Sequence, residues 1–234
     1  MNIYNNEKTM QTILTIKYGE KYSAADVNRI VNDTDGKYNY ACITDDSTDL
    51  DSSVKIIPMP EGVEGHWVKI WMYTLEELGD VLYLDLDVRI QKNIDHLWNS
   101  IDNVPTIAYT YWKNKEWPDH DGGTHGMRYL SNYNSSVVMW KSGTVNHIWE
   151  HFERNSDYYM VKYFGDDRFL WHEDFQFNKF PQGEIYSFVY GADYYGVDDD
   201  NDSFVYRPRY TIALLNGLDQ FPGADRKYDQ LRMR

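Results

Sequence analysis

Two aspartates separated by one leucine carry the clearest chemistry in this sequence. The apolar residues Val81 to Leu84 lead directly into Asp85 and Asp87. An apolar run this short predicts a strand covered on both faces, as in a parallel sheet. Side chains two residues apart on a strand point to the same side, so both carboxylates are expected to face one crevice at the carboxyl edge of the sheet. Neighbouring carboxylates repel one another unless a proton or cation lies between them, and oxygen ligands suit Mg²⁺ or Mn²⁺.

The first hundred residues alternate predicted strands with predicted helices. One helix is expected to begin after Ser23, which has Asp26 three residues later, and to run to about residue 31. Another is expected over residues 66–78, where apolar residues recur at helical spacing and Gly79 follows. This order is typical of a doubly wound, mostly parallel α/β sheet. The expected strands are residues 12–17, 38–44, 54–57 and the run from residue 81.

The rest of the chain is less regular. Residues 113–128 form an aperiodic polar loop that is long enough to suggest a function. No internal repeat or linker-like boundary interrupts the chain, so the sequence predicts one domain over residues 1–234. The expected strands here are residues 105–109, 137–140, 185–189 and 210–215, and the expected helices are residues 93–98 and 145–154.

The composition argues against several classes of partner. A formal charge of −14 disfavours binding to a nucleic-acid backbone. An anionic ligand would need local positive charge, which a divalent metal can supply. No apolar run reaches the roughly 18–20 residues of a membrane span, and the first residues lack the apolar core of a signal peptide, so we expect a cytoplasmic protein. Cys42 is the single cysteine, which excludes an internal disulfide.

Several motifs, taken in order, resemble the GT-A glycosyltransferases, the superfamily that includes glycogenin and the bacterial lipopolysaccharide galactosyltransferases. Residues 93–97 form an Asn-Ile-Asp-x-Leu sequence behind the Asp-x-Asp motif, as is frequent in that superfamily. The remaining matches are similar to small bacterial and phage members, and together they extend the resemblance over residues 12–217. They are residues 17–23, 27–28, 44–46, 67–70, 133–137, 165–170 and 181–188.

The resemblance implies both a fold and an activity. The implied fold is GT-A, an α/β, Rossmann-like fold with a doubly wound, mostly parallel central sheet and a smaller acceptor-side half. Residues 1–100 would bind the nucleotide, and residues 101–234 the sugar and acceptor. The implied reaction is metal-dependent transfer from a nucleotide sugar, UDP-linked, to a glycan, lipid or protein acceptor. Mn²⁺ or Mg²⁺ would be the metal, and retention of the anomeric configuration follows by analogy with glycogenin. A phage-encoded member would act in the host cytoplasm.

The resemblance also assigns roles to residues. Asp85, Asp87 and Asn216 are the implied metal ligands. Asn216 replaces a histidine that usually precedes a glycine, and a neutral amide oxygen binds a hard cation more weakly than a carboxylate. Asp167 replaces a glutamine. The implied nucleotide-binding residues are Lys17, Tyr18, Tyr22, Asp45, Lys69 and Asp85, and those implied for the catalytic, sugar-binding side are Asn134, Asp166 and Asp167.

Most of these residues also have a purely structural interpretation. The Asp-x-Asp motif would then be a solvated strand end, and Lys69 a surface lysine of a helix. Asn134 would open a strand by bonding its own backbone. Asp166 and Asp167 would form the acidic first turn of a helix.

Two pairs outside these motifs carry weaker predictions. Glu173 and Asp174 are reserve candidates for the general base that an inverting reaction requires. His147 and His151 have a metal-binding spacing on an expected helix. No third ligand lies close to them in the sequence, so a solvated helix face is the favoured interpretation.

Two other functions fit part of the pattern. A phosphatase of the haloacid dehalogenase type would use Asp85 as nucleophile and Asp87 as acid and base. That family carries the motif on its first strand, whereas here several predicted strands precede it. A non-catalytic sugar-binding module is the other alternative, and it would need no metal-dependent nucleotide site.

Overall fold

The computed structural model describes residues 10–110, 131–193, 196–197 and 204–233, so the loop predicted at 113–128 lies outside the described residues. The described strands are β1 (Gln11–Lys17), β2 (Asn39–Thr44), β3 (Val54–Pro58), β4 (Asp80–Leu84), β5 (Val88–Ile90), β6 (Thr106–Tyr109), β7 (Tyr133–Trp140), β8 (Asn178–Lys179), β9 (Ile185–Ser187), β10 (Ala192–Asp193), β11 (Gly196–Val197) and β12 (Ile212–Leu214). The described α-helices are α1 (Ala24–Asp33), α2 (Val68–Trp71), α5 (Asn146–Glu153), α6 (Ser156–Lys162), α7 (Asp166–His172) and α8 (Ala224–Arg232).

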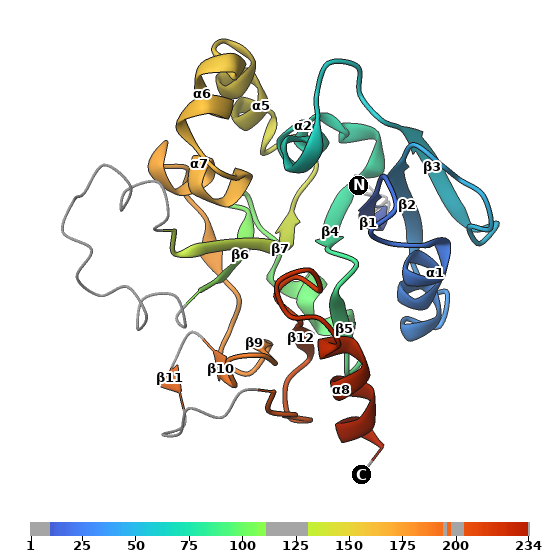
Figure 1. Ribbon diagram of the computed structural model, residues 1–234. Helices are drawn as coiled ribbons and strands as arrows, with labels where there is room; N and C mark the ends of the chain where they lie inside the picture. The colour runs from blue at the N-terminus through green and yellow to red at the C-terminus, as the bar shows by residue number, and fades with distance from the viewer. Residues whose placement is uncertain (1–9, 111–130, 194–195, 198–203, 234) are drawn as a thin grey trace, which may run out of the picture.

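The larger sheet has the order β3-β2-β1-β4-β7-β6-β8 in the described chain (Figure 1). β1 pairs in parallel with β2 and with β4, and β2 pairs in parallel with β3. β7 runs antiparallel to both β4 and β6. The prediction of a mostly parallel α/β sheet is confirmed. Because β2 and β4 flank β1 on opposite sides, the strand order reverses between β1 and β4, and such a switch point opens a crevice at the carboxyl ends of the strands.

Both faces of this sheet are covered by apolar side chains. Leu14 and Tyr83 belong to one buried cluster together with side chains of α5 and α7. Their chain neighbours Ile13 and Leu82 belong to a second cluster with side chains of α1. Successive residues of a strand point to opposite faces, so every residue of β4 is buried. The prediction that the apolar run is a strand covered on both faces is confirmed.

The helix predicted over residues 66–78 is not continuous. The segment consists of α2 flanked by three short 3-10 helices, and Leu75 interrupts it with a non-helical backbone of φ −84° and ψ 63°. Trp67 and Tyr73 are buried in the core, so packing of bulky rings overrides the helical periodicity here. The 3-10 helices are η1 (Gly65–Trp67), η2 (Met72–Thr74), η3 (Glu76–Leu78) and, further on where residues 93–98 were expected to be helical, η4 (Asp95–Ser100).

A smaller sheet has the order β11-β10-β9-β12-β5 in the described residues. The turn after β4 carries the chain directly into β5, which pairs antiparallel with β12. The C-terminal helix α8 lies beside β5 in Figure 1, and its Tyr228 is fully buried in a cluster with Phe188 of this region. Because β7 pairs with β4 and β12 with β5, strands from before and after residue 100 pair in both sheets. None of the described helices is both long enough and apolar enough to cross a membrane.

Candidate active site

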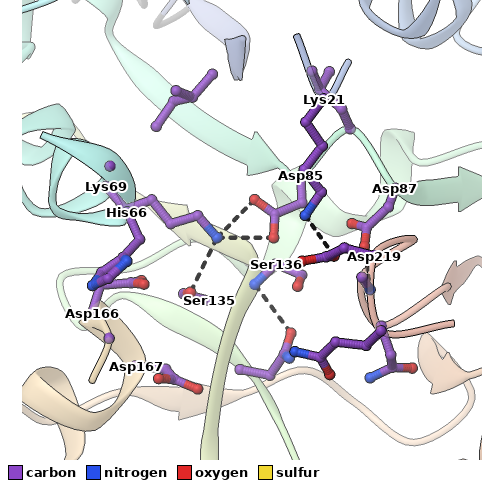
Figure 2. Close-up of a pocket in the computed structure, with 18 of the residues that line it drawn as sticks. Lys21, His66, Lys69, Asp85, Asp87, Ser135, Ser136, Asp166, Asp167 and Asp219 are labelled. Atoms are coloured by element: carbon purple, nitrogen blue, oxygen red, sulfur yellow. Dashed lines mark hydrogen bonds and ion pairs between the residues drawn. The ribbon is translucent and has the colours of Figure 1, made fainter. Parts of the chain in front are cut away.

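The Asp-x-Asp motif lies where the chain passes from one sheet to the other. β4 ends at Leu84, and Asp85 begins a turn in which the Val88 amide donates to its carbonyl oxygen at 3.2 Å. The prediction that strand alternation aligns Asp85 with Asp87 is wrong, because the turn rather than a strand positions them. Both nevertheless line one pocket of about 470 Å³ (Figure 2), a volume that suits a small-molecule ligand.

Asp85 is paired with a lysine from α2. The Lys69 ammonium lies 2.7 Å from Asp85 Oδ1 and 2.8 Å from Oδ2, and it also donates to Ser135 Oγ at 3.3 Å. The Tyr83 hydroxyl donates to the same carboxylate. Burial lowers the pKa of Lys69, but the charges of Asp85 and Asp166 outweigh it, so the pKa is raised and the ammonium is retained. The interpretation of Lys69 as a surface lysine is therefore wrong.

Asp87 is almost completely buried. Its Oδ2 accepts a hydrogen bond of 2.6 Å from the Gly217 amide, which follows β12. Burial raises the pKa of Asp87, the nearby charge of Asp85 raises it further, and the Gly217 bond offsets only part of this. A solvated strand end is thus excluded for this residue. The pair consists of two mutually repelling carboxylates in a pocket, an arrangement that a bound cation relieves.

The donor atoms around this pair fit a hard cation. Asp85, Asp87 and Asn216 all line the pocket and offer oxygen ligands, which Mg²⁺ and Mn²⁺ accept. Asn216 Oδ1 already accepts a hydrogen bond from the Ser187 hydroxyl at 2.5 Å, so one of its two lone pairs remains for a metal. In the described chain no cluster of three or more His, Cys, Asp and Glu side chains is placed to hold a metal. Any metal would therefore rest on two carboxylates, with Asn216 as a predicted weak third ligand.

The residues predicted for the sugar side also line the pocket. Asp166 begins α7 and is 5% exposed, and its Oδ2 is buried without a hydrogen-bond partner in the described residues. Burial raises the pKa of Asp166, although the charge of Lys69 opposes this. Asp167 pairs with Arg168 at 3.2 Å. Asn134 Oδ1 accepts the Ser136 amide at 3.1 Å, which is the structural interpretation made from the sequence, yet its side chain also lines the pocket.

The nucleotide-binding residues predicted near the ends of β1 and β2 fall into two groups. Tyr18 and Tyr22 line the pocket. Lys17 and Asp45 are not among its lining residues. The Lys17 ammonium donates to the Asp46 carbonyl oxygen at 2.9 Å, and Asp45 accepts the Gly19 amide at 2.9 Å. These two residues hold the loops after β1 and β2 in place, and a role in nucleotide binding stays a prediction for all four.

Several pocket residues carry no individual prediction from the sequence. Lys21 and Arg168 lie within motifs that support the resemblance, so the motifs point to them indirectly. His66 precedes the Trp67–Ile70 motif directly. Asp219 lies on the loop after β12, whose Gly217 amide bonds Asp87, and its local sequence does not indicate a position in the pocket.

The reserve candidates for a general base lie elsewhere. Glu173 accepts hydrogen bonds from Lys162 at 2.9 Å and from Tyr163, and it lies 3.0 Å from His151 Nε2. Burial alone would raise the pKa of Glu173, but these bonds lower it to about 2. Neither Glu173 nor Asp174 lines the pocket. His151 is engaged by Glu173 and Tyr159, so it belongs to this structural network.

Crystal structures of several glycosyltransferases are similar to most of the chain. The galactosyltransferase LgtC, solved with donor and acceptor sugar analogues, has a TM-score of 0.59 and 13% identity, covering 95% of this chain and 95% of that chain. A glycosyltransferase involved in glycosylation of the major capsid of PBCV-1 has a TM-score of 0.52 and 12% identity, covering 96% and 100%. Mouse xyloside xylosyltransferase 1 has a TM-score of 0.50 and 15% identity, covering 88% and 97%. No protein-family model and no curated protein sequence matches the chain.

These likenesses define the fold. The chain has the GT-A fold of LgtC, with a seven-stranded, mostly parallel sheet in its described part and a smaller second sheet. The Asp-x-Asp motif follows the fourth strand, at the switch point, which agrees with the GT-A resemblance of the sequence and disagrees with the position expected for a haloacid dehalogenase-type phosphatase.

Proposed function

We propose that this protein is a metal-dependent glycosyltransferase that transfers a sugar from a UDP-linked donor to a glycan, lipid or protein acceptor. The observation that carries the proposal is the repelling pair Asp85 and Asp87 in a pocket at the switch point of a GT-A fold. The likeness to glycosyltransferases solved at low identity supports the fold on which the proposal rests.

Different residues of the pocket can bind different parts of such a donor. Tyr18 is half exposed and presents a ring on which a nucleobase can stack. The carboxylates would hold Mn²⁺ or Mg²⁺, which when bound supplies positive charge for the departing diphosphate. Lys69 orients the Asp85 carboxylate through two short contacts. Asp166 lines the same pocket, so its carboxylate is our candidate acceptor for sugar hydroxyls.

We infer retention of the anomeric configuration by analogy with glycogenin. In the transfer, the bond from the anomeric carbon to the diphosphate oxygen breaks, and a bond to the acceptor oxygen forms. The acceptor proton then passes to a diphosphate oxygen, so a side-chain base is not required. Glu173 is unsuited to that task because it lies outside the pocket and its pKa is about 2.

Ligand-dependent thermal unfolding of the wild-type protein tests the proposal. UDP with Mn²⁺ should raise the melting temperature, since a ligand at about 100 times its Kd stabilises by about 2.7 kcal/mol. A panel of nucleotide sugars incubated with Mn²⁺ should show slow hydrolysis of one donor, reversibly lost with chelator. Stabilisation by beryllofluoride with Mg²⁺ but not by UDP would favour a phosphatase, and sugar binding without nucleotide or metal binding would favour the module.

A further inference from the structure

One lysine of the pocket, Lys21, forms an ion pair with a carboxylate from a distant part of the chain, Asp219. Lys21 lies on the turn between β1 and α1, and its ammonium is 2.8 Å from Asp219 Oδ1 (Figure 2). Both residues line the pocket. We propose that Lys21 binds the diphosphate of the donor nucleotide and that Asp219 holds it in the ligand-free protein. This inference rests on the proposed function and adds a binding residue to it.

The charges lining the pocket create the need for such a residue. Five described lining residues are carboxylates and three are lysine or arginine, so the lining itself is negative. A diphosphate brings further negative charge into the same space, and a divalent cation neutralises only part of the total. The carboxylates are Asp85, Asp87, Asp166, Asp167 and Asp219, and the cations are Lys21, Lys69 and Arg168.

Two of these three cations have partners that are difficult to replace. Lys69 and Asp85 are 16% and 22% exposed as side chains, and Arg168 and Asp167 are 20% and 12% exposed. Breaking a pair of this kind leaves a poorly solvated charge behind. Lys21 and Asp219, in contrast, are 46% and 63% exposed. Exposed ion pairs contribute little stability, so a diphosphate can displace Asp219 at little cost.

Lys21 also lies close to the atoms that a diphosphate would approach. Lys21 and Asp87 line the same pocket. The Lys21 ammonium is 5.2 Å from the centre of the Tyr22 ring, which also lines the pocket. Asp219 lies on the same loop as Gly217, which bonds Asp87. A lysine is a compact charge on a flexible stem, so Lys21 can exchange Asp219 for a phosphate oxygen near the predicted metal ligands.

If the diphosphate replaces Asp219 as the partner of Lys21, substitutions of Lys21 and of Asp219 should change nucleotide affinity in opposite directions. Removing Lys21 deletes a charge-assisted hydrogen bond to the diphosphate, whereas neutralising Asp219 removes a competitor for the lysine. A purely structural ion pair would instead give the same loss from either side, with no dependence on the phosphate groups.

Isothermal titration calorimetry with UDP and with uridine, both in Mn²⁺, separates these possibilities. Lys21→Ala should weaken UDP binding about tenfold and leave uridine binding within about twofold. Asp219→Asn should tighten UDP binding about two- to fivefold and lose this effect when combined with Lys21→Ala. Lys55→Ala is the matched control, because Lys55 forms an ion pair with Glu77 that is 51% and 55% exposed and lies outside the pocket lining.

Each other result overturns the inference. If Lys21→Ala leaves UDP affinity unchanged, or weakens UDP and uridine equally, Lys21 does not bind the diphosphate. If Asp219→Asn weakens UDP binding, Asp219 is not a competitor. A wild-type protein that binds no UDP would defeat the proposed function and this inference together, whereas wild-type binding that is insensitive to Lys21→Ala would defeat the inference alone.

Discussion

Two acidic regions of this molecule differ in how many hydrogen bonds and ion pairs their carboxylates receive from the protein. Glu173, among α5, α6 and α7, receives hydrogen bonds or ion pairs from Lys162, Tyr163 and His151, and its pKa falls to about 2. Asp87 in the pocket has the Gly217 amide as its donor, and burial and the charge of Asp85 raise its pKa. One region has its negative charge neutralised by its own side chains, whereas the other leaves charge for an external partner.

The extent of hydrogen bonding therefore distinguishes structural from functional carboxylates. A charge that is fully hydrogen-bonded within the protein stabilises the fold, as at Glu173. A buried carboxylate that is incompletely paired lowers stability and persists where a ligand satisfies it. Asp166, buried with one oxygen unpartnered, belongs with Asp87 by this criterion. The sequence treated Glu173 as a possible catalytic base, and the contacts assign it to the structural region.

The largest expected effect follows from Asp87→Asn. The amide retains an acceptor for the Gly217 N–H but loses the charge that would bind a cation, so we expect turnover of a UDP-sugar with Mn²⁺ to fall on the order of 100- to 1,000-fold. The melting temperature should stay equal or rise, because repulsion with Asp85 is removed. Donor hydrolysis and thermal unfolding measure the two quantities, with the exposed Asp51→Asn as control. Full activity in the Asp87 variant would contradict the pocket's assignment.

Glu173→Ala should show the opposite pattern. Loss of charge-assisted hydrogen bonds in this cluster should lower the free energy of unfolding by about 2 kcal/mol. UDP affinity of the folded protein should not change, because Glu173 does not line the pocket. Chemical denaturation and calorimetry test both statements. A variant of normal stability that fails to bind UDP would reverse the comparison between the two regions.

The contribution of Glu173 should also depend on pH in a defined direction. Its pKa falls from 4.5 to about 2 on folding, so its stabilisation is complete above about pH 5 and is lost as the pH falls through 4.5 towards 2. The stability difference between wild type and Glu173→Gln should therefore shrink between pH 6 and pH 3. Urea denaturation at a series of pH values measures it, and a difference that grows on acidification would be incompatible with the hydrogen-bonded carboxylate.

The smallest expected effect belongs to Asp166→Asn. Removing a buried charge with an unpartnered oxygen should stabilise the protein, by at most about 1 kcal/mol because Lys69 loses a favourable charge at the same time. Donor turnover should fall, since a neutral amide oxygen accepts hydrogen bonds from sugar hydroxyls more weakly than a carboxylate does. Denaturation and hydrolysis assays compare these changes. If Asp166→Asn destabilises the protein, Asp166 is a structural carboxylate like Glu173 and not a ligand-binding carboxylate like Asp87.

The structure confirms the predictions that depended on the pattern of neighbouring residues. The apolar runs predicted β1 to β4, and the run before Asp85 predicted a strand buried on both faces, because alternation and composition are properties of neighbouring residues. The motif order also predicted the fold, and Lys69 does lie beside Asp85. The helix over residues 66–78 was mispredicted because tertiary packing of Trp67 and Tyr73 overrides local periodicity.

The sequence by itself determined the strands β1 to β4, the GT-A resemblance and the presence of two carboxylates after a buried strand. Only the tertiary structure decided that a turn positions these carboxylates, that the Gly217 amide donates a hydrogen bond to Asp87, and that Lys21 forms an ion pair with Asp219. It also decided that Glu173 is neutralised while Asp166 is not. The physical reason is that a local pattern fixes which face a residue occupies, whereas the partners that set its charge come from distant segments brought together by packing of the two sheets.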